Sequence, residues 1–198
     1  MRPRHPGPNL PVRCQGSWFG HDLDMTDTAV ASAVPTTGQL VARYATAFNS
    51  MFATTHSVTS PLGAWMLLSI AAPATTGETR TRLEAILGCT AQDAFRRASA
   101  LLAEPHRAVG SAAAVWARTH FLNDLFHAFS ESLPDTVEQG HVPRNEDADR
   151  WASTNTGGMI ESFPVPIDDA TAVVLATAVA TDVSWIAPFQ TASAADLA

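Results

Sequence analysis

The side chains that could act in catalysis are plentiful in this sequence, but they stand in no recognisable catalytic frame. Its 198 residues include 7 histidines, 2 cysteines and numerous serines and aspartates, the residue types used in nucleophilic and acid–base catalysis. No serine lies in a G-x-S-x-G sequence, the turn that exposes the nucleophile in α/β-hydrolases. Because residue types without a frame do not define a triad, we predict that the protein is not an enzyme and has no catalytic residues.

Two other patterns could be mistaken for a metal site or a phosphate site. His120 and His127 are seven residues apart and could share one face of a helix, but no cysteine or third histidine completes a metal-ligand set at helical spacing. Gly157 and Gly158 lack the G-x-x-x-x-G-K-[ST] frame of a phosphate-binding loop, and they follow a helical pattern, so a helix stop explains them. We therefore predict no metal site, no cofactor-binding residues and no cofactor.

Composition and charge narrow the classes of partner. Hydrophobic residues make up 46% of the chain, which is sufficient to build a core. The formal net charge is −7, with 12 basic residues scattered among 19 acidic ones, so nucleic acid is not an expected partner. The longest apolar runs, 64–74 and 171–181, are shorter than the roughly 20 residues of a membrane-spanning helix, and we predict no membrane association. Cys14 and Cys89 are predicted to be free thiols.

The amino-terminal residues differ from the rest of the chain. Residues 1–37 mix proline, glycine and polar side chains without a helical or strand period, so we predict a disordered leader, with Met25 as a second candidate for the first residue. No secretory signal is visible there, which leaves the localisation undetermined between the cytoplasm, by default, and the extracellular space. The domain is predicted to span 38–198, and it begins with a helix of about 15 residues in which Leu40, Tyr44 and Phe48 recur at helical spacing.

Helix ends are marked clearly between residues 60 and 88. Ser60 precedes Pro61, as expected of an N-cap followed by a proline in the first turn of a helix. Thr75 and Glu78 have the spacing of a capping box, and Gly88 can take the left-handed conformation that ends a helix. We therefore predict one helix from Pro61 and a second, shorter one that ends before Gly88.

The remaining pattern predicts two strands among further helices. Residues 111–118 indicate a buried strand, and 171–185 are rich in β-branched, uncharged residues typical of a central strand. Further helices are predicted after Thr90, around 122–129 and over 146–156. The sequence thus predicts an α+β fold in which the aromatic side chains pack in the core; these are Trp65, Trp116, Trp151 and Trp185.

Four stretches, in this order and at compatible spacing, resemble the serpin family of serine protease inhibitors. The first, "SVTSPLGAWMLLSIAAPATTGETRTRLEAILG" (57–88), is similar to the serpin segment that enters a helix through Ser-Pro. The others are "SAAAVWARTHFLNDLFHAF" (111–129), "WASTNTGGMIESF" (151–163) and "TAVVLATAVATDVSWIAPF" (171–189). Together they cover roughly residues 38–190 and resemble the amino-terminal half of that fold.

The resemblance implies a fold and a function. The implied fold is serpin-like α+β, with helices A to F and strands of the central mixed or antiparallel sheet, and it is incomplete. The implied activity is inhibition of a serine-type endopeptidase by a suicide-substrate mechanism, with a serine protease as the partner of full-length relatives. Because no reactive-centre loop or reactive site follows in this chain, we expect it not to inhibit alone. The alternative is a non-inhibitory fragment or remnant that acts, if at all, as a protein-interaction module. Self-association through unpaired strands is a further candidate interaction of the incomplete fold.

The same resemblance assigns structural roles to a few residues. Ser57, Ser60 and Pro61 correspond to the serpin shutter region, and Trp185 corresponds to the breach tryptophan. Thr177 stands where the family usually has an asparagine that forms hydrogen bonds across the opening sheet. Threonine has one hydroxyl where asparagine has an acceptor and two donor hydrogens, so it can make fewer bridges. These residues are expected to govern sheet opening, not chemistry.

Overall fold

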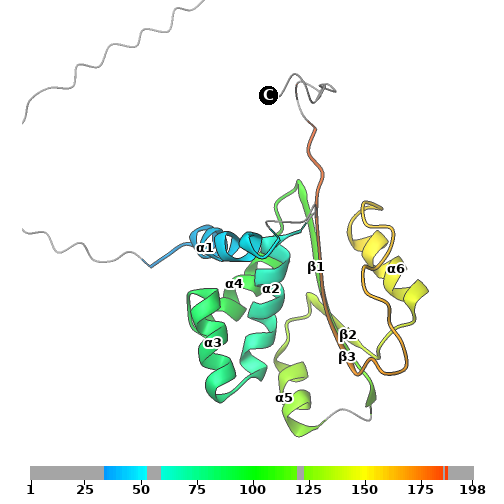
Figure 1. Cartoon of the computed structure of the whole chain (residues 1–198). Coiled ribbons are helices and arrows are strands. Elements are labelled where there is room, and N and C mark those ends of the chain that lie inside the picture. The colour runs from blue at the N-terminus through cyan, green and yellow to red at the C-terminus, as the bar shows by residue number, and fades with distance from the viewer. Residues whose placement is uncertain (1–33, 53–58, 120–122, 185, 187–198) are drawn as a thin grey trace, which may run out of the picture. The chain divides into compact units, whose positions relative to one another are not determined.

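A computed structural model of the chain describes residues 34–52, 59–119, 123–184 and 186. Across these residues it contains six α-helices, one short 3-10 helix and three strands (Figure 1), which confirms the predicted α+β class. The helices are α1 (Thr37–Ser50), α2 (Pro61–Ala71), α3 (Gly77–Leu87), α4 (Ala91–Ala103), α5 (Asp124–Ser132) and α6 (Asn145–Asn155), with η1 (Ala72–Ala74) after α2. The strands are β1 (Val109–Ala117), β2 (Val137–Gly140) and β3 (Val173–Thr181).

The three strands form one mixed sheet in the order β2-β1-β3. β1 runs parallel to β2, with Ala113 opposite Val137, and antiparallel to β3, with Ala113 opposite Thr177. The prediction that 171–185 forms a central strand was wrong for the described part of the chain, where β1 is central and β3 pairs on one side only. A run of β-branched residues indicates burial of side chains, but it carries no information on how many neighbours a strand has.

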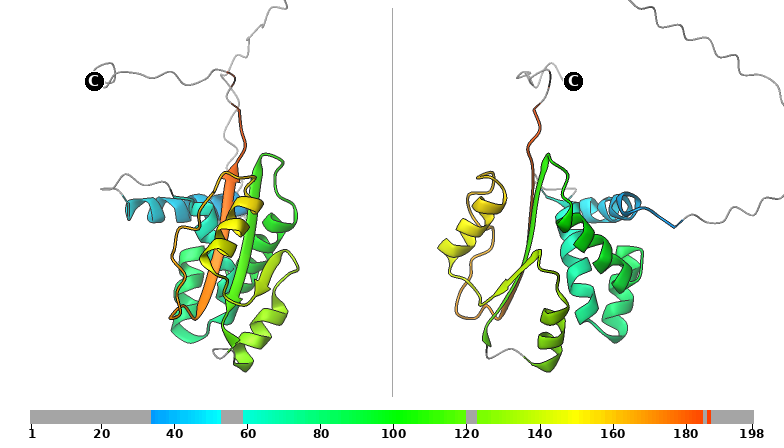
Figure 2. Two further views of the ribbon diagram at one scale, coloured as in Figure 1. Left: turned by 90° about the vertical axis from the view of Figure 1, so that its right-hand side faces the viewer. Right: turned by 180° about the vertical axis from the view of Figure 1, so that it is seen from behind.

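Helix α6 lies on one side of the sheet and helices α1 to α4 lie on the other (Figure 2). The sheet separates two hydrophobic cores. On one face, Ala113 and Val115 of β1 pack with side chains of α1, α2, α3 and α4. On the other face, Ala114 and Trp116 pack with α6 and with small side chains of β3. Because successive residues of a strand point to opposite faces, β1 supplies both cores in alternation. Three of the predicted core tryptophans are at most 8% exposed; these are Trp65, Trp116 and Trp151.

Most predicted helix ends are confirmed, and one is corrected. Ser60 caps α2 with Pro61 in the first turn, and Gly88 ends α3 with a φ of 75°. The proposed capping box from Thr75 to Glu78 was wrong, because α3 begins at Gly77 after a Thr76 N-cap whose side chain makes no capping bond. The Thr75 hydroxyl instead donates to the carbonyl of Ala72 at 2.7 Å, within the turn formed by η1.

The segment between α6 and β3 is held in place by two side chains from other elements. Asn145 forms two hydrogen bonds with the backbone of Ile167, at 2.8 and 3.1 Å. Arg118 donates to the carbonyls of Asp168 and Thr171, at 2.7 and 2.8 Å. The Thr171 hydroxyl also donates to the Asp168 carboxylate, which holds the pKa of that carboxyl below its ordinary value. These bonds fix the point at which the chain enters β3.

Replacing Thr90 with alanine should loosen the start of α4, because the Thr90 hydroxyl accepts the N–H of Asp93 at 3.2 Å. Loss of such a cap costs about 1 kcal/mol, so amides of the first turn should exchange about fivefold faster in a hydrogen-exchange measurement. The matched control is Thr76→Ala, which removes an N-cap threonine that makes no capping bond. Equal acceleration in both variants would contradict the prediction.

Candidate functional site where strand β3 meets helix α2

The first turn of α2 is shaped by three residues close in sequence. Ser60 has an extended backbone, with φ −113° and ψ 98°, and its Oγ accepts the N–H of Gly63 at 3.1 Å. Pro61 occupies the first turn, where a backbone N–H would have no helical partner. The helix therefore starts at a fixed point, with the backbone of the buried Gly63 beside the serine side chain.

Thr177 connects β3 to this turn. Its hydroxyl donates to the carbonyl of Gly63 at 3.0 Å, across 114 residues of sequence. Thr177 lies in the middle of β3 and pairs with Ala113, whose side chain belongs to the core shared with α2. The bond therefore ties the centre of the strand to the helix that covers this face of the sheet.

Gly63 was not identified by the sequence analysis, although the contact depends on it. A Cβ at this position would lie 3.3 Å from both Ser60 Oγ and Thr177 Oγ1, which is tighter than ordinary van der Waals contact. Only glycine lets the strand approach the helix this closely without displacing one of the two hydroxyls. Its presence in the first turn was the available signal, because glycine is disfavoured inside helices unless a close approach requires it.

The outer edge of β3 has unpaired backbone groups. Arg118 N–H donates to Ala172 O, and Asp182 N–H donates to Ala108 O. In an antiparallel ladder these bonds recur at every second residue, so the even-numbered residues of β3 face β1. Among the described strands, no partner meets the backbone groups on the opposite edge, which belong to Val173, Leu175, Thr177, Val179 and Thr181.

A hollow of about 380 Å³ lies beside this edge. Leu67 of α2, Trp151 of α6 and Phe163 of the α6–β3 segment line it together with Leu175 and Thr177. The described residues of its lining are largely apolar, and none of them has an ionisable side chain. The hollow and the open strand edge together give room for a further extended segment next to β3, which would pair with the unpaired backbone groups.

The structure brings together some of the predicted shutter residues. Ser60 and Thr177 each form a hydrogen bond with the backbone of Gly63, and Pro61 lies in the same first turn of α2. Ser57 and Trp185 lie outside the described residues, so their predicted positions stay predictions. The contact contains donors and acceptors but no nucleophile with an adjacent base, and its chemistry is that of a mechanical connection between strand and helix.

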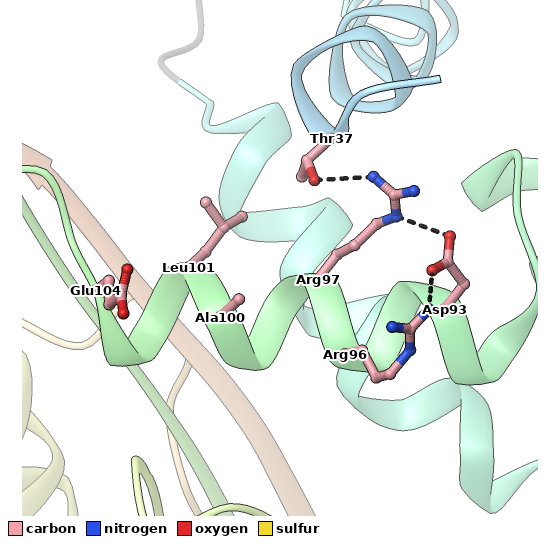
Figure 3. Close-up of a pocket in the computed structure, with 7 residues that line it drawn as sticks. All are labelled: Thr37, Asp93, Arg96, Arg97, Ala100, Leu101 and Glu104. Carbon is pink, nitrogen blue, oxygen red and sulfur yellow. Dashed lines mark hydrogen bonds and ion pairs between the residues drawn. The ribbon is translucent and has the colours of Figure 1, made fainter. Parts of the chain in front are cut away.

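A second hollow, between α4 and the start of α1, is charged but balanced (Figure 3). Asp93 accepts from Arg96 at 2.6 Å and from Arg97 at 2.7 Å. Arg97 also donates to the Thr37 hydroxyl at 3.2 Å, and Glu104 lines the same hollow. Since two carboxylates offset two guanidinium groups, we assign no anion site here; the cluster connects α4 to the first turn of α1.

Reactive and metal-binding side chains form no candidate site in the described ranges. Within them, no group of three or more histidine, cysteine, aspartate or glutamate side chains could hold a metal ion. Cys89 is a free thiol, and its pKa is raised by burial and by Asp93, which makes it a weak nucleophile at neutral pH. His120 and Cys14 lie outside the described residues. No described helix is both long and apolar enough to cross a bilayer.

Comparison with known protein families identifies the chain. The family model "Serpin (serine protease inhibitor)" matches residues 37–196. The chain belongs to the serpin family. A search of curated protein sequences found no match.

Solved serpin structures share this fold. One is a loop C-sheet serpin polymer, with 22% sequence identity and a TM-score of 0.58 over 68% of this chain and 39% of that chain. Another is the thermophilic serpin tengpin in its latent state, with 19% identity and a TM-score of 0.55 over 76% of this chain and 43% of that chain. A third is the Arabidopsis serpin AtSerpin1 in its native stressed conformation, with 17% identity and a TM-score of 0.53 over 71% of this chain and 41% of that chain. The serpin chain described here therefore spans less than half the length of these relatives. Its six described helices and three-stranded mixed sheet form part of the serpin α+β fold.

Thr177→Val should weaken the attachment of β3 to α2, because it removes the hydroxyl that donates to Gly63 O while keeping a β-branched shape. We expect a loss of about 1 kcal/mol, equivalent to a decrease of about 2–4 °C in the thermal midpoint measured by circular dichroism. Thr181→Val is the control, since Thr181 is an exposed residue at the end of the same strand. A Thr177→Val midpoint equal to that of the control would refute the assigned bond.

Proposed function

We propose that this chain is the amino-terminal portion of a serpin-type inhibitor of serine proteases, and that inhibition needs further serpin segments which complete the sheet. The observation that carries the proposal is the edge of β3. Its centre is attached to α2 through Thr177 and Gly63, while its outer backbone groups have no strand partner in the described part of the chain. In the serpin mechanism, a protease-cleaved loop is added to the sheet as a strand, and such an edge suits that step.

Within this proposal, the contact between Thr177 and the α2 turn acts as the shutter. A single hydrogen bond contributes about 1 kcal/mol, which is strong enough to favour one position of the strand and weak enough to break when the sheet opens. An asparagine at position 177 could make additional bonds, so threonine gives a shutter with fewer connections. Ser57 and Trp185 are proposed to contribute to the shutter and the breach, as the family resemblance implies.

We further propose that the 198-residue polypeptide by itself does not trap a protease. Trapping requires a loop that the protease acylates and a strained sheet that accepts the cleaved loop, and strain persists only where the surrounding structure enforces it. The described sheet has three strands, which gives β3 little support on its outer side. A serine protease is thus the proposed partner of the completed fold, not of this polypeptide alone.

A second candidate function is a non-inhibitory interaction module. Large apolar side chains are exposed along β3 and just after it, including Val173 at 42%, Leu175 at 37% and Val183 at 56% exposure. Apolar side chains next to an unpaired strand edge favour association with a partner protein. This candidate predicts binding without cleavage.

Incubation of the purified polypeptide with trypsin, elastase and subtilisin tests the first proposal. We expect no covalent complex on denaturing gel electrophoresis, because the acylated intermediate needs a reactive loop. An inhibitory full-length serpin run in parallel serves as the positive control. A band at the summed mass that resists boiling in detergent would overturn the proposal that this polypeptide alone is non-inhibitory.

Solution behaviour separates the two candidates. If the polypeptide depends on missing segments, its unpaired edge should give concentration-dependent oligomers in size-exclusion chromatography and a broad urea transition in tryptophan fluorescence. This is the outcome we expect. A monomer with one cooperative transition would instead favour an autonomous interaction module.

A further inference from the structure

A groove of about 610 Å³ lies between α1 and the end of α3, and it shares no residue with the β3 site. Its floor is fully apolar, since Leu40 is 1% exposed and Leu87 is 0% exposed. Its rim is open, with Met51 at 75% and Ile86 at 52% exposure. Helix α1 and the C-cap of α3 approach closely at the floor, where a Cβ on Gly88 would lie 3.1 Å from Leu40 Cδ2. A groove of this size and lining is within the usual range of small-molecule sites.

Among the described residues, Arg43 is the only charged side chain that lines the groove. It is exposed on α1, and among the described residues it forms no ion pair or hydrogen bond. Most other described arginines are paired with a carboxylate or a carbonyl, as Arg97 is with Asp93. Arg107 is the exception that resembles Arg43, but it lies outside the groove. The groove therefore combines an apolar wall with one positive charge that is not neutralised.

Tyr44 adds a second polar group to the lining of the groove. It is 8% exposed and stacks on Phe48 with ring centroids 5.4 Å apart. Its hydroxyl has no hydrogen-bond partner in the described part of the chain. Burial raises the pKa of Tyr44, so the phenol stays protonated at neutral pH and can donate.

We propose that this groove binds an amphiphilic carboxylate, of the class of medium- and long-chain fatty acids. The alkyl chain lies against the apolar wall formed by α1 and α3. The carboxylate accepts hydrogen bonds from the Arg43 guanidinium and the Tyr44 hydroxyl, because both side chains line the groove from α1. Guanidinium groups suit carboxylates because their parallel N–H groups match the two oxygens. A neutral amphiphile would leave the positive charge of Arg43 unpaired, and a dianion would carry one negative charge more than Arg43 can pair. A ligand with a single carboxylate therefore matches the groove best.

The site does not depend on the serpin mechanism proposed above. Its residues belong to α1, α2 and α3 and to the helix ends at Met51 and Gly88, and none contributes to the β3 edge. Binding can therefore be tested on the whole 198-residue polypeptide, and the result does not depend on whether that polypeptide inhibits a protease.

Titration with 11-(dansylamino)undecanoate, followed by displacement with dodecanoate below its micelle concentration, tests the proposal. We expect saturable fluorescence enhancement, and dodecanoate should displace the probe at least about tenfold better than dodecan-1-ol, because only the acid pairs with Arg43. Arg43→Gln should lower the affinity for dodecanoate about tenfold and leave the affinity for dodecan-1-ol unchanged. Tyr44→Phe should lower the affinity for dodecanoate about fivefold, as expected for the loss of one hydrogen bond to a charged group.

Two further variants keep the test decisive. Arg107→Gln removes an equal charge outside the groove and should bind both ligands as the parent does. Ala47→Trp places a large ring at an exposed groove position of α1 and should abolish binding of the probe with an unchanged circular dichroism spectrum. Equal dodecanoate affinity in Arg43→Gln and Arg107→Gln, equal affinity for acid and alcohol, or undiminished binding in Ala47→Trp would each overturn the proposal.

Discussion

The antiparallel pairing of β1 with β3 is the constraint on which the rest of the structure depends. Its register, with Ala113 opposite Thr177, places alternate side chains of β1 in two separate cores and the even-numbered side chains Val174, Ala176 and Ala178 of β3 in the core beside α6. A shift by one residue would exchange the two faces, sending the small side chains that fit under α6 toward α2. The same shift would turn the Thr177 hydroxyl away from Gly63. Core packing and the proposed shutter contact therefore follow from one choice of register.

The two faces of β3 and its outer edge have different surroundings. One face is covered by α6 and by the segment anchored through Asn145 and Arg118. The other face is attached to α2 through the Thr177 hydroxyl. The outer edge exposes backbone groups that no described strand satisfies. A strand that is covered by α6 on one face, attached to α2 on the other and open at its edge has room for an added strand, and the proposed inhibitory role rests on that arrangement.

Polar side chains in this protein mainly organise the backbone. Ser60 and Thr90 cap helices, and Asn145 binds the backbone of Ile167. Asp93 neutralises two arginines at the start of α4. Arg43 and Tyr44 differ from these, because their polar groups have no assigned partner among the described residues and both line an apolar groove. That contrast is why we place ligand binding there and not in the charged hollow beside α4.

The sequence by itself determined the helices and the family. Helix ends at Ser60, Gly88 and Thr90 could be predicted because capping depends on chemistry within a few residues, and motif order was sufficient to indicate a serpin. Only the tertiary structure decided that β1 is the central described strand, that the short β2 exists and that Gly63 lies against Thr177, 114 residues away. Such features depend on contacts between distant segments, and a local pattern of residue types carries no information about which segments will meet.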